Sequence, residues 1–375
     1  MTPRTALVCI LSLAAPSAPS EAAEREFTAE TGALRVRSVA TGLAHPWSLA
    51  FLPDGRMLVT ERPGRLRIVA PDGRLSEPVE GVPEVHAQGQ GGLLDVALDP
   101  AFASNGRIYL SYAGPGDGGA ATTVARARLA DGRLQDLAVI FRQRPGIRGS
   151  DNHFGSRLAF APDGNLFVTT GDRYSQRELA QDVATHIGKI VRIAPDGTAP
   201  DDNPWAGGGE GLPEIWSFGH RNVQGAAIHP ETGALWAHEH GAQGGDEINV
   251  PQPGRNYGWP VITHGMDYDG SKIGVGPEKA GMEQPAYHWT PSIAPSGMAF
   301  YTGDAFPDWR GNLLVGSLKF ALLVRLELDG TRVVREERLL KGLGERIRDV
   351  RQGPDGLVYL LTDSPRGQIL QVAPQ

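Results

Sequence analysis

The chain has 375 residues, of which 40% are hydrophobic, so it is long enough to build a large core. Its 49 glycines and 29 prolines make up about a fifth of the chain, which indicates many turns but stays below the range of disordered sequences. The formal net charge of -7 and the lack of a long basic run argue against a nucleic acid partner.

Residues 1–23 have the pattern of a secretory signal. Arg4 precedes an apolar run over residues 6–15, small residues follow, and cleavage after Ala22 fits the pattern. The apolar run is too short for an ordinary transmembrane helix, so we expect no stable membrane insertion. The single cysteine, Cys9, lies in this segment, and the mature chain would therefore contain no disulfide bond. We predict export to a bacterial periplasm.

From residue 49 onward one short pattern occurs six times: an apolar stretch, a turn that contains proline, and a short strand of alternating apolar residues. The copies lie at residues 49–60, 96–110, 158–169, 227–236, 298–315 and 350–361. Their turn prolines are about 45 to 80 residues apart, which is typical of propeller blades with loops of varied length; they are Pro53, Pro100, Pro162, Pro230, Pro307 and Pro354. We therefore predict an all-β protein, a six-bladed β-propeller over residues 35–375, preceded by an N-terminal lead at 24–34.

A second strand pattern follows most of these turns. Apolar residues alternate with period two and the runs are separated by Asp-Gly turns, as in β-hairpins. The clearest examples lie at residues 64–69, 124–129, 188–193, 322–328 and 367–372. At most one short helix is expected, between residues 177 and 187. Four strand-poor stretches are predicted to form loops on one face, where function usually concentrates; they are 113–122, 142–155, 196–213 and 262–297.

His153 lies in a loop flanked by glycines, Gly149 and Gly155. A histidine in such a loop can act as a general base because its unperturbed pKa lies near neutrality. Asp172, which follows the next predicted strand, could orient the imidazole. The alternative is a loop histidine bonded to backbone and a turn aspartate with no chemical role.

Arg221 lies between His220 and Asn222 in a segment bounded by glycines. A guanidinium there could hold a carboxylate or a quinone oxygen. The alternative is a structural arginine that caps strand carbonyl groups.

A third segment, residues 238–249, combines histidines with carboxylates. Its histidines are two residues apart, which does not fit the helical zinc motif with histidines four apart. Glycines together with Asp246 and Glu247 suit a hard, oxygen-binding cation such as calcium better. Asp267 and Asp269 form a fragment of a calcium loop that, taken alone, indicates a turn.

A basic group occurs late in the chain. Arg346 and Arg348 alternate and therefore share one face of a strand, and Lys319 precedes them. Two like charges on one face are usually solvated, and they gain a functional role if that face points at a polyanionic ligand. No Gly-x-Gly-x-x-Gly after a strand and no phosphate-binding loop occurs, so a nicotinamide or nucleotide cofactor has no support.

Taken together, these segments resemble the soluble aldose sugar dehydrogenases that use pyrroloquinoline quinone, relatives of soluble glucose dehydrogenase. The resemblance covers nearly the whole mature chain. Its motifs lie at residues 89–94, 152–158, 219–222, 239–241, 245–249, 256–260, 317–319 and 346–350. It implies a six-bladed propeller, which agrees with the count of repeats.

The resemblance also implies roles for particular residues. His153 would take the proton from the sugar C1 hydroxyl, Asp172 would orient His153, and Arg221 would stabilise negative charge on the quinone. The product would be the lactone, with hydride passing from C1 to the quinone. The residues implied to hold the cofactor are Gln90, Asn152, His153, Arg221, Asn222, Lys319, Arg346 and Arg348.

Calcium is implied as a second cofactor, acting as a Lewis acid on the quinone carbonyl. The backbone carbonyls of Gly241 and Ala242 match the family's ligand pair, although the family has proline where this chain has Ala242. A further, structural calcium is implied at Glu247, Tyr257, Tyr268 and Glu283. Asn152 stands where glucose-specific relatives have aspartate, which favours loose sugar selectivity.

Three functions remain open at this point. The first is a quinoprotein dehydrogenase with an aldose substrate and an unassigned electron acceptor, as a monomer or homodimer. The second is a calcium-dependent lactonase on the same fold, against which the cationic group at Lys319, Arg346 and Arg348 argues. The third is a propeller that only binds proteins or glycans, since fold does not decide function.

Overall fold

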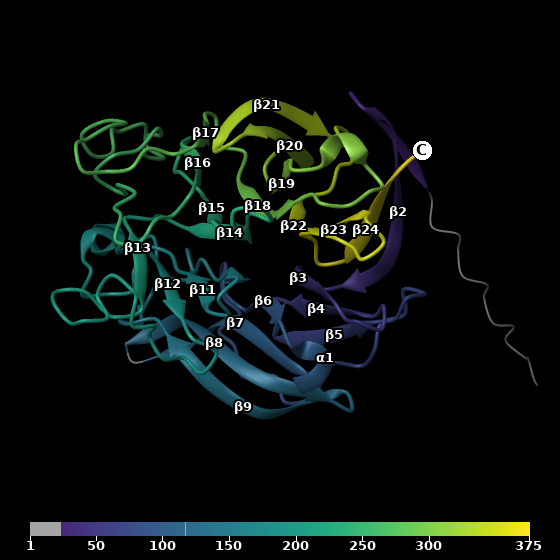
Figure 1. Cartoon of the computed structure of the whole chain (residues 1–375), viewed down its shortest axis with the longest axis horizontal. Coiled ribbons are helices and arrows are strands. Elements are labelled where there is room, and N and C mark those ends of the chain that lie inside the picture. Colours follow the sequence, from purple (N-terminus) through teal and green to yellow (C-terminus); the bar gives the residue numbers. More distant parts are fainter. Residues whose placement is uncertain (1–23, 117) are drawn as a thin grey trace, which may run out of the picture.

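The computed structural model describes residues 24–116 and 118–375, so the predicted signal at residues 1–23 lies outside the described residues. Six antiparallel sheets stand around a central axis (Figure 1), and the predicted six-bladed propeller is confirmed. In the described part of the chain, no helix is both long and apolar enough to cross a membrane.

From β3 to β24, the blades follow one another in chain order. The first contains β3 (Pro46–Phe51), β4 (Met57–Glu61) and β5 (Arg65–Val69). The second contains β6 (Leu93–Leu98), β7 (Arg107–Gly116), β8 (Gly119–Ala130) and β9 (Arg133–Arg142). The third contains β10 (Leu158–Phe160), β11 (Leu166–Thr169), β12 (Lys189–Ile193) and β13 (Ile215–Phe218).

The remaining three blades complete the ring. The fourth contains β14 (Val223–Ile228), β15 (Leu235–Glu239), β16 (Asp246–Asn249) and β17 (Tyr287–Trp289). The fifth contains β18 (Pro295–Phe300), β19 (Leu313–Ser317), β20 (Leu322–Asp329) and β21 (Arg332–Leu339). The sixth contains β22 (Ile347–Gln352), β23 (Val358–Thr362) and β24 (Gly367–Pro374), followed by β2 (Gly32–Leu43) and β1 (Arg25–Ala29).

The helical segments are short. They are α1 (Phe102–Asn105) and two 3-10 turns, η1 (Arg177–Gln181) and η2 (Pro307–Trp309). The short helix expected between residues 177 and 187 is therefore present as η1.

The repeated proline turn closes the inner hairpin of each clear copy. In the first copy Gly55 N–H donates to Leu52 C=O (3.0 Å) and Leu52 N–H donates to Arg56 C=O (2.8 Å), with Pro53 between them. Gly55 has φ +85°, a backbone conformation that glycine adopts without steric cost. Proline at the second position and glycine at the fourth suit a type I turn.

Each sheet is buried on both faces because it packs between two neighbours. On β11, Leu166 and Val168 belong to a cluster shared with the second blade, which includes Tyr109. Phe167, between them in sequence, packs instead with Val223 of the fourth blade. Alternate side chains of one strand thus bind two different sheets, and a lone blade would leave both faces exposed.

Two expectations about secondary structure need correction. Residues 24–34, expected to be a lead, form β1 and the start of β2, and β2 pairs with β24 to join the two ends of the chain in one blade (Figure 1). Of residues 113–122, expected to be a loop, 113–116 lie in β7 and 119–122 lie in β8, and the two strands pair as a long hairpin. A Cβ at Gly114 would lie 2.7 Å from the ring of Tyr112, so the glycine permits close packing within the strand.

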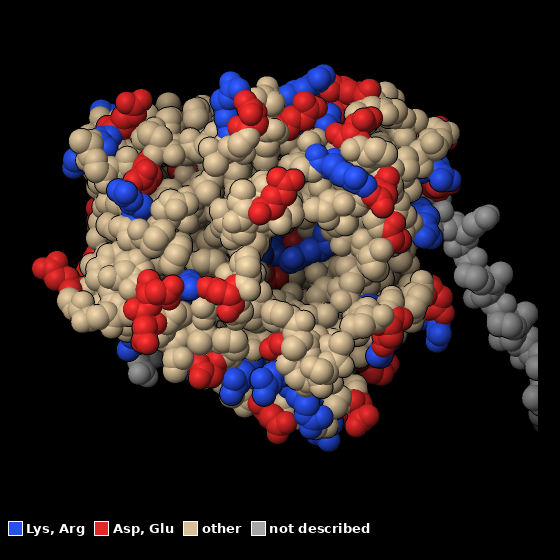
Figure 2. Space-filling view, viewed as in Figure 1, with Lys and Arg blue, Asp and Glu red and all other residues tan. Residues whose placement is uncertain are grey.

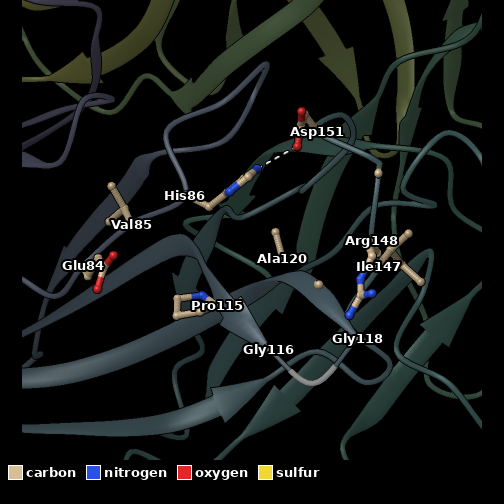
Figure 3. Close-up of a pocket in the computed structure, with 12 residues that line it drawn as sticks. Glu84, Val85, His86, Pro115, Gly116, Gly118, Ala120, Ile147, Arg148 and Asp151 are labelled. Carbon is tan, nitrogen blue, oxygen red and sulfur yellow. Dashed lines mark hydrogen bonds and ion pairs between the residues drawn. The ribbon is translucent and has the colours of Figure 1, made fainter.

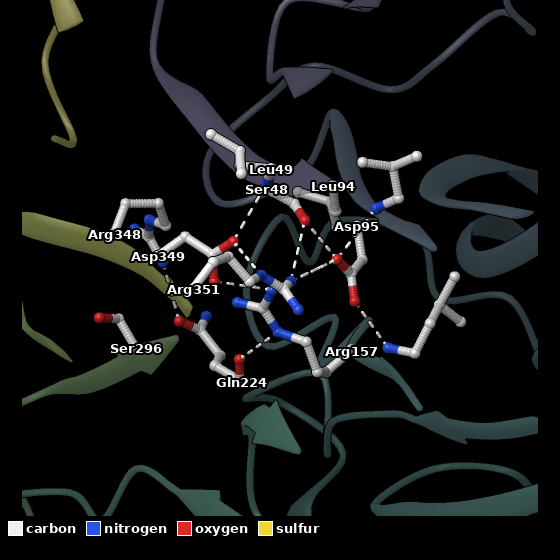
Figure 4. A network of polar contacts seen from close by, with 12 residues as sticks. Ser48, Leu49, Leu94, Asp95, Arg157, Gln224, Ser296, Arg348, Asp349 and Arg351 are labelled. Atoms are coloured by element: carbon white, nitrogen blue, oxygen red, sulfur yellow. Dashed lines mark hydrogen bonds and ion pairs between the residues drawn. The ribbon is translucent and has the colours of Figure 1, made fainter. Parts of the chain in front are cut away.

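An ionic network fastens the innermost strands around the axis (Figure 4). Arg157, which directly precedes β10, lies 3.3 Å from Asp95 of β6 and 3.1 Å from Asp349 of β22. Arg351 of β22 also contacts both carboxylates, at 3.2 Å and 2.8 Å. Ser48 of β3 donates to Asp95. Two arginines and two aspartates from distant parts of the sequence thus neutralise one another's charge at the axis.

The network continues to the fourth and sixth blades. Arg157 Nε donates to the backbone carbonyl of Gln224 on β14 (3.0 Å), and the side chain of Gln224 accepts from Arg348 Nη1 (3.0 Å). In the fifth blade, Ser296 Oγ on β18 donates to the carbonyl of Ile347 (2.7 Å). All six blades are therefore tied together at the axis by polar contacts.

We predict that Asp95→Ala lowers the free energy of unfolding by about 3–5 kcal/mol, because it leaves buried Arg157 without one of its two counter-ions. Denaturant unfolding followed by circular dichroism measures this. The matched control is Asp72→Ala, which removes an exposed partner of Arg74 and should change stability by less than about 1 kcal/mol. Equal effects of the two substitutions would contradict a structural role for the network.

Candidate active site

A buried histidine–aspartate pair lies in the loops above the inner strands of the third blade. His153 Nδ1 is 2.6 Å from Asp172 Oδ1, and both side chains are buried, at 7% and 1% exposure. A carboxylate can only accept, so Nδ1 carries the proton and Nε2 is left with a free lone pair. The pairing predicted from the sequence therefore has the geometry of a general base with its orienting partner.

Asp172 is itself held by several donors. Tyr174 N–H donates to Oδ1 (2.7 Å) and the indole N–H of Trp259 donates to Oδ2 (2.8 Å). The N–H of Asp172 donates to the carbonyl of Arg221 (2.7 Å), which joins the third and fourth blades at this point. Each carboxylate oxygen thus has a fixed partner.

The environment sets the protonation of the pair. Burial lowers the pKa of His153, the hydrogen bond to Asp172 raises it, and the charge of Arg221 lowers it; the net direction is downward. Burial acts to raise the pKa of Asp172, but the hydrogen bond from His153 and the charge of Arg221 outweigh it and lower the pKa. At neutral pH the imidazole is therefore neutral and the carboxylate ionised, which is the state a general base needs.

The backbone around the pair is strained. His153, Ser156, Arg173 and Tyr174 all have positive φ, at +54°, +83°, +56° and +60°. Such conformations cost non-glycine residues free energy and persist only where the surroundings enforce them. Four such residues in two adjoining loops indicate a site whose geometry is imposed by its contacts.

Arg173 supplies many of those contacts. Its guanidinium donates to the carbonyls of Asn152 (3.0 Å), Ala120 (2.7 Å) and Ser150, and it stacks on the ring of Phe154 at 3.8 Å. Burial lowers the pKa of Arg173 to about 10, so it stays charged at neutral pH. The arginine therefore clamps the loop that carries His153.

Gln90 holds the same loop from the second blade. Its side-chain oxygen accepts from His153 N–H (2.9 Å), and its own N–H donates to the carbonyl of Asp151 (2.8 Å). Asp151 in turn pairs with His86 at 2.6 Å in the wall of a cavity of about 460 Å³ (Figure 3). Gln90 thus contacts the loop that carries His153, and Asn152 lies in that loop.

Arg221 and Asn222 lie beside the pair. Arg221 Nη1 donates to the carbonyl of His240 (3.1 Å), Nη2 lies 3.5 Å from the hydroxyl of Tyr268, and the guanidinium lies over the ring of Trp259 at 5.2 Å. Asn222 accepts from the N–H of Gly155 (3.1 Å). Both predicted residues are buried. Asn222 contacts the loop that carries His153, and the backbone carbonyl of Arg221 accepts from the N–H of Asp172.

The predicted cationic group lies at the sixth blade. Arg346 and Arg348 both donate to Asp363, at 3.2 Å each, with Arg348 buried and Arg346 half exposed. Burial acts against ionisation of Asp363, but the two arginines hold its pKa well below the usual range. Lys319 is exposed near them, since Arg346 also donates to the carbonyl of the preceding residue, Leu318 (3.1 Å). Figure 2 shows basic side chains inside the central hollow.

Buried hydrogen-bond donors without a partner indicate where a ligand could bind, and some of the predicted cofactor-binding residues carry such donors. Within residues 24–116 and 118–375, Arg221 Nε, Asn222 Nδ2 and Arg348 Nε are buried and have no hydrogen-bond partner. Buried donors are normally satisfied. These three donors belong to residues predicted to bind the cofactor, and an anionic ligand rich in oxygen acceptors would satisfy them. Among the described residues Arg62 Nε and Arg157 Nη2, outside the predicted set, are also buried without a partner.

The residues predicted to bind calcium lie less close together than the residues around His153 and Asp172. Gly241 N–H donates to buried Asp246 (2.8 Å), and Ala242 packs beside Trp259. In the described residues no group of three or more His, Cys, Asp or Glu side chains could hold a metal ion. The site at Gly241 and Ala242 would therefore depend on backbone oxygens.

The residues predicted for the second calcium are separated in part. Glu247 lies near Glu239, because Asn249 Nδ2 donates to both carboxylates, at 3.3 Å and 3.1 Å. Burial and the charge of Glu239 raise the pKa of Glu247 well above its usual range. Tyr257 donates to the carbonyl of Val250 (2.9 Å).

The other two members of that set contact different partners. Glu283 lies 3.6 Å from Arg255. Tyr268 reaches Arg221 at the active site, and no contact in the described part of the chain joins it to Glu247.

The sequence reasoning missed four residues that the structure places at the site. Trp259 and Glu239 lie in motifs already noted, yet their contacts with Asp172 and with Arg221 N–H were not foreseen. Arg173 follows Asp172 directly in sequence. Asp363 carried no signal, because nothing in its local sequence links it to Arg346 and Arg348.

A propeller with a buried histidine–aspartate pair and a cationic centre defines a class of sugar-oxidising enzymes, the glucose/sorbosone dehydrogenase family. The family's sequence model matches residues 43–371. The chain belongs to this family.

Individual relatives agree with that assignment. The chain is 49% identical over 339 residues to the aldose sugar dehydrogenase YliI of Escherichia coli (strain K12), covering 89% of this chain and 91% of the relative. A crystal structure of a glucose dehydrogenase superposes with a TM-score of 0.89 at 51% identity, covering 91% of this chain and 99% of that one. The pyrroloquinoline quinone-bound aldose sugar dehydrogenase of Streptomyces coelicolor gives 0.74 at 32% identity, over 90% and 98%. The chain is therefore an enzyme of the sugar dehydrogenase class.

We predict that Arg173→Lys loosens the loop that carries His153, since an ammonium cannot make the forked contacts of a guanidinium. Losing buried hydrogen bonds should cost about 1–3 kcal/mol, seen as faster hydrogen exchange at residues 150–155. Arg177→Lys is the control, because Arg177 is partly exposed and pairs with Asp267 at the surface. Unchanged exchange in the Arg173 variant would refute the clamp.

Proposed function

We propose that this protein is a quinoprotein that oxidises the C1 hydroxyl of aldose sugars to the lactone, with pyrroloquinoline quinone as its cofactor. The observation that carries the proposal is the neutral, buried His153, fixed by Asp172 beside the guanidinium of Arg221. Family membership favours this function over the lactonase and the binding-only propeller. A pyrroloquinoline quinone bound here would supply the two-electron oxidant that takes hydride from C1.

The residues of this chain account for the proton and for the developing charge. His153 Nε2 takes the proton of the C1 hydroxyl, while Asp172 stabilises the imidazolium that forms. Arg221 lies where its free Nε–H can stabilise negative charge on an acceptor oxygen. Burial excludes water from the pair and strengthens these interactions.

Several groups would hold the tricarboxylate cofactor. Arg348, Arg346 and Lys319 supply positive charge on the sixth and fifth blades, and Asn222 supplies an amide donor. Gln90 and Asn152 would complete the cofactor site, since Gln90 contacts the loop that carries His153 and Asn152 lies in it.

Calcium is part of the proposal. Backbone oxygens of Gly241 and Ala242 would hold one ion, which would act as a Lewis acid on the cofactor. The close carboxylates of Glu239 and Glu247 would be relieved of their mutual repulsion by a second divalent ion. Tyr257, Tyr268 and Glu283 were predicted with Glu247, and their ligation stays part of this proposal.

The cellular setting is also proposed. Residues 1–23 would direct export to the periplasm, where an aldose and an electron acceptor would meet the mature enzyme as a monomer or homodimer. Asn152, in place of aspartate, would permit a broad range of aldoses.

We predict that purified protein supplied with pyrroloquinoline quinone, calcium, an aldose and an artificial electron acceptor reduces the acceptor dye, and that chelating calcium abolishes the reaction. His153→Ala should lower kcat about a hundredfold or more, because the general base is lost. Calorimetric titration should show that this variant still binds the cofactor.

His229→Ala is a suitable control, because His229 accepts N–H groups of its own turn in the fourth blade. It should retain full activity. Absence of dye reduction with every aldose and simple alcohol tested would refute the function.

We predict that kcat/KM falls as the pH drops through an apparent pKa below 6.5. Below that value His153 is protonated and cannot accept the proton, and burial keeps its pKa under the ordinary value. Asp172 stays ionised throughout, since its pKa is lowered. Steady-state rates between pH 4 and pH 9 measure the profile, and an acid limb well above 6.5 would contradict the assignment.

A further inference from the structure

Trp259 contacts both Asp172, the partner of His153, and Arg221. Its indole N–H donates to Asp172 Oδ2 (2.8 Å), and the guanidinium of Arg221 lies over its ring at 5.2 Å. The side chain is buried, in a cluster with Ala180, Ala242 and Ile273. One ring therefore contacts the carboxylate that orients the base and the cation expected to stabilise charge.

The indole has a distinct place among the donors to Asp172. Oδ1 accepts from both His153 Nδ1 and Tyr174 N–H, whereas in the described part of the chain Trp259 alone donates to Oδ2. A carboxylate held at both oxygens resists rotation about its Cβ–Cγ bond more than one held at a single oxygen. The indole therefore adds a second restraint on the orientation of the carboxylate, to which the imidazole is bonded.

The position of Trp259 is itself fixed by the backbone. Its N–H donates to the carbonyl of Gly219 (2.9 Å), and its carbonyl accepts from Gln181 Nε2 (2.7 Å). Gln181 ends η1, whose carbonyls at Leu179 and Ala180 accept from buried Lys189 at 3.0 Å and 2.9 Å. The ring is thus held by the third blade as well as by its own loop.

We propose that Trp259 is a positioning residue for the reaction, which orients Asp172 and weakens the basicity of its carboxylate while supporting Arg221. This inference rests on the proposed function. A hydrogen bond to the ionised carboxylate withdraws charge that would otherwise stabilise the imidazolium, so removing the bond raises the pKa of His153. In the described part of the chain, the other charged or titratable groups that face the pair are Arg221, Arg173, Arg177, His240 and Tyr174, whose ring packs edge-on against His153.

Trp259→Phe tests the inference, because it keeps an aromatic ring and removes the N–H. The imidazole titration of His153, followed by nuclear magnetic resonance of histidine-labelled protein, should move upward by about 0.5–1 pKa unit. The acid limb of kcat/KM should move to higher pH by the same amount. We expect kcat to fall about five- to tenfold, with KM for the aldose changed less than about twofold.

Trp216→Phe is the matched control. It also loses an indole hydrogen bond, to the carbonyl of Pro251 (3.1 Å), but Trp216 lies in the third blade away from the pair. Its His153 titration should match that of the unaltered protein. An unchanged titration in Trp259→Phe, or an equal shift in Trp216→Phe, would overturn the inference.

A measurement on the unaltered protein covers the case in which Trp259→Phe does not fold. One of the seven indole N–H resonances should shift with the same midpoint as His153, because the bond to Asp172 responds to the charge on the imidazole. If all seven stay unmoved, the inference is wrong. These titrations need no turnover, so loss of the proposed activity and loss of this role are distinguishable.

Discussion

The structure depends on the charge pairing of Arg157 with Asp95 and Asp349 at the propeller axis. Blades pack on one another through apolar faces, which are non-directional and do not by themselves fix where the ring closes. The buried ions supply direction, since a charge removed from water needs partners at defined distances. The network therefore joins the innermost strands of different blades beneath the loops that they carry.

The same network leads into the site. Gln224 is bonded to Arg157 through its backbone and to Arg348 through its side chain, so the cationic centre rests on the axial network. Above it, Arg157 directly precedes β10 and follows the loop that carries His153. The axial network therefore lies next to the residues of the candidate site in the sequence and in space. It supports the loops in which His153 and Arg173 adopt positive φ angles.

Much of the fold was predictable because its signals are local. Proline turns and alternating apolar residues depend on near neighbours in the chain, so the six repeats were visible directly. The wrong secondary-structure predictions concern segments whose conformation depends on pairing with strands elsewhere in the chain. Residues 113–116 were expected to lie in a loop, yet they form the end of β7 because they pair with residues 119–122 of β8. Residues 24–34 pair within the sheet of the sixth blade, although the C-terminal strand they join lies over 300 residues away.

The sequence alone determined the number of blades, and it singled out His153 and Asp172, which the structure pairs, and the cationic residues Arg346 and Arg348. It could not show that Trp259 reaches Asp172 across 87 residues, or that Asp363 joins Arg346 to Arg348. It also could not show that the hydroxyl of Tyr268 lies 3.5 Å from Arg221 Nη2. The physical reason is that turns and strands are set by short-range geometry, whereas these contacts exist only after ring closure brings distant loops to one axis.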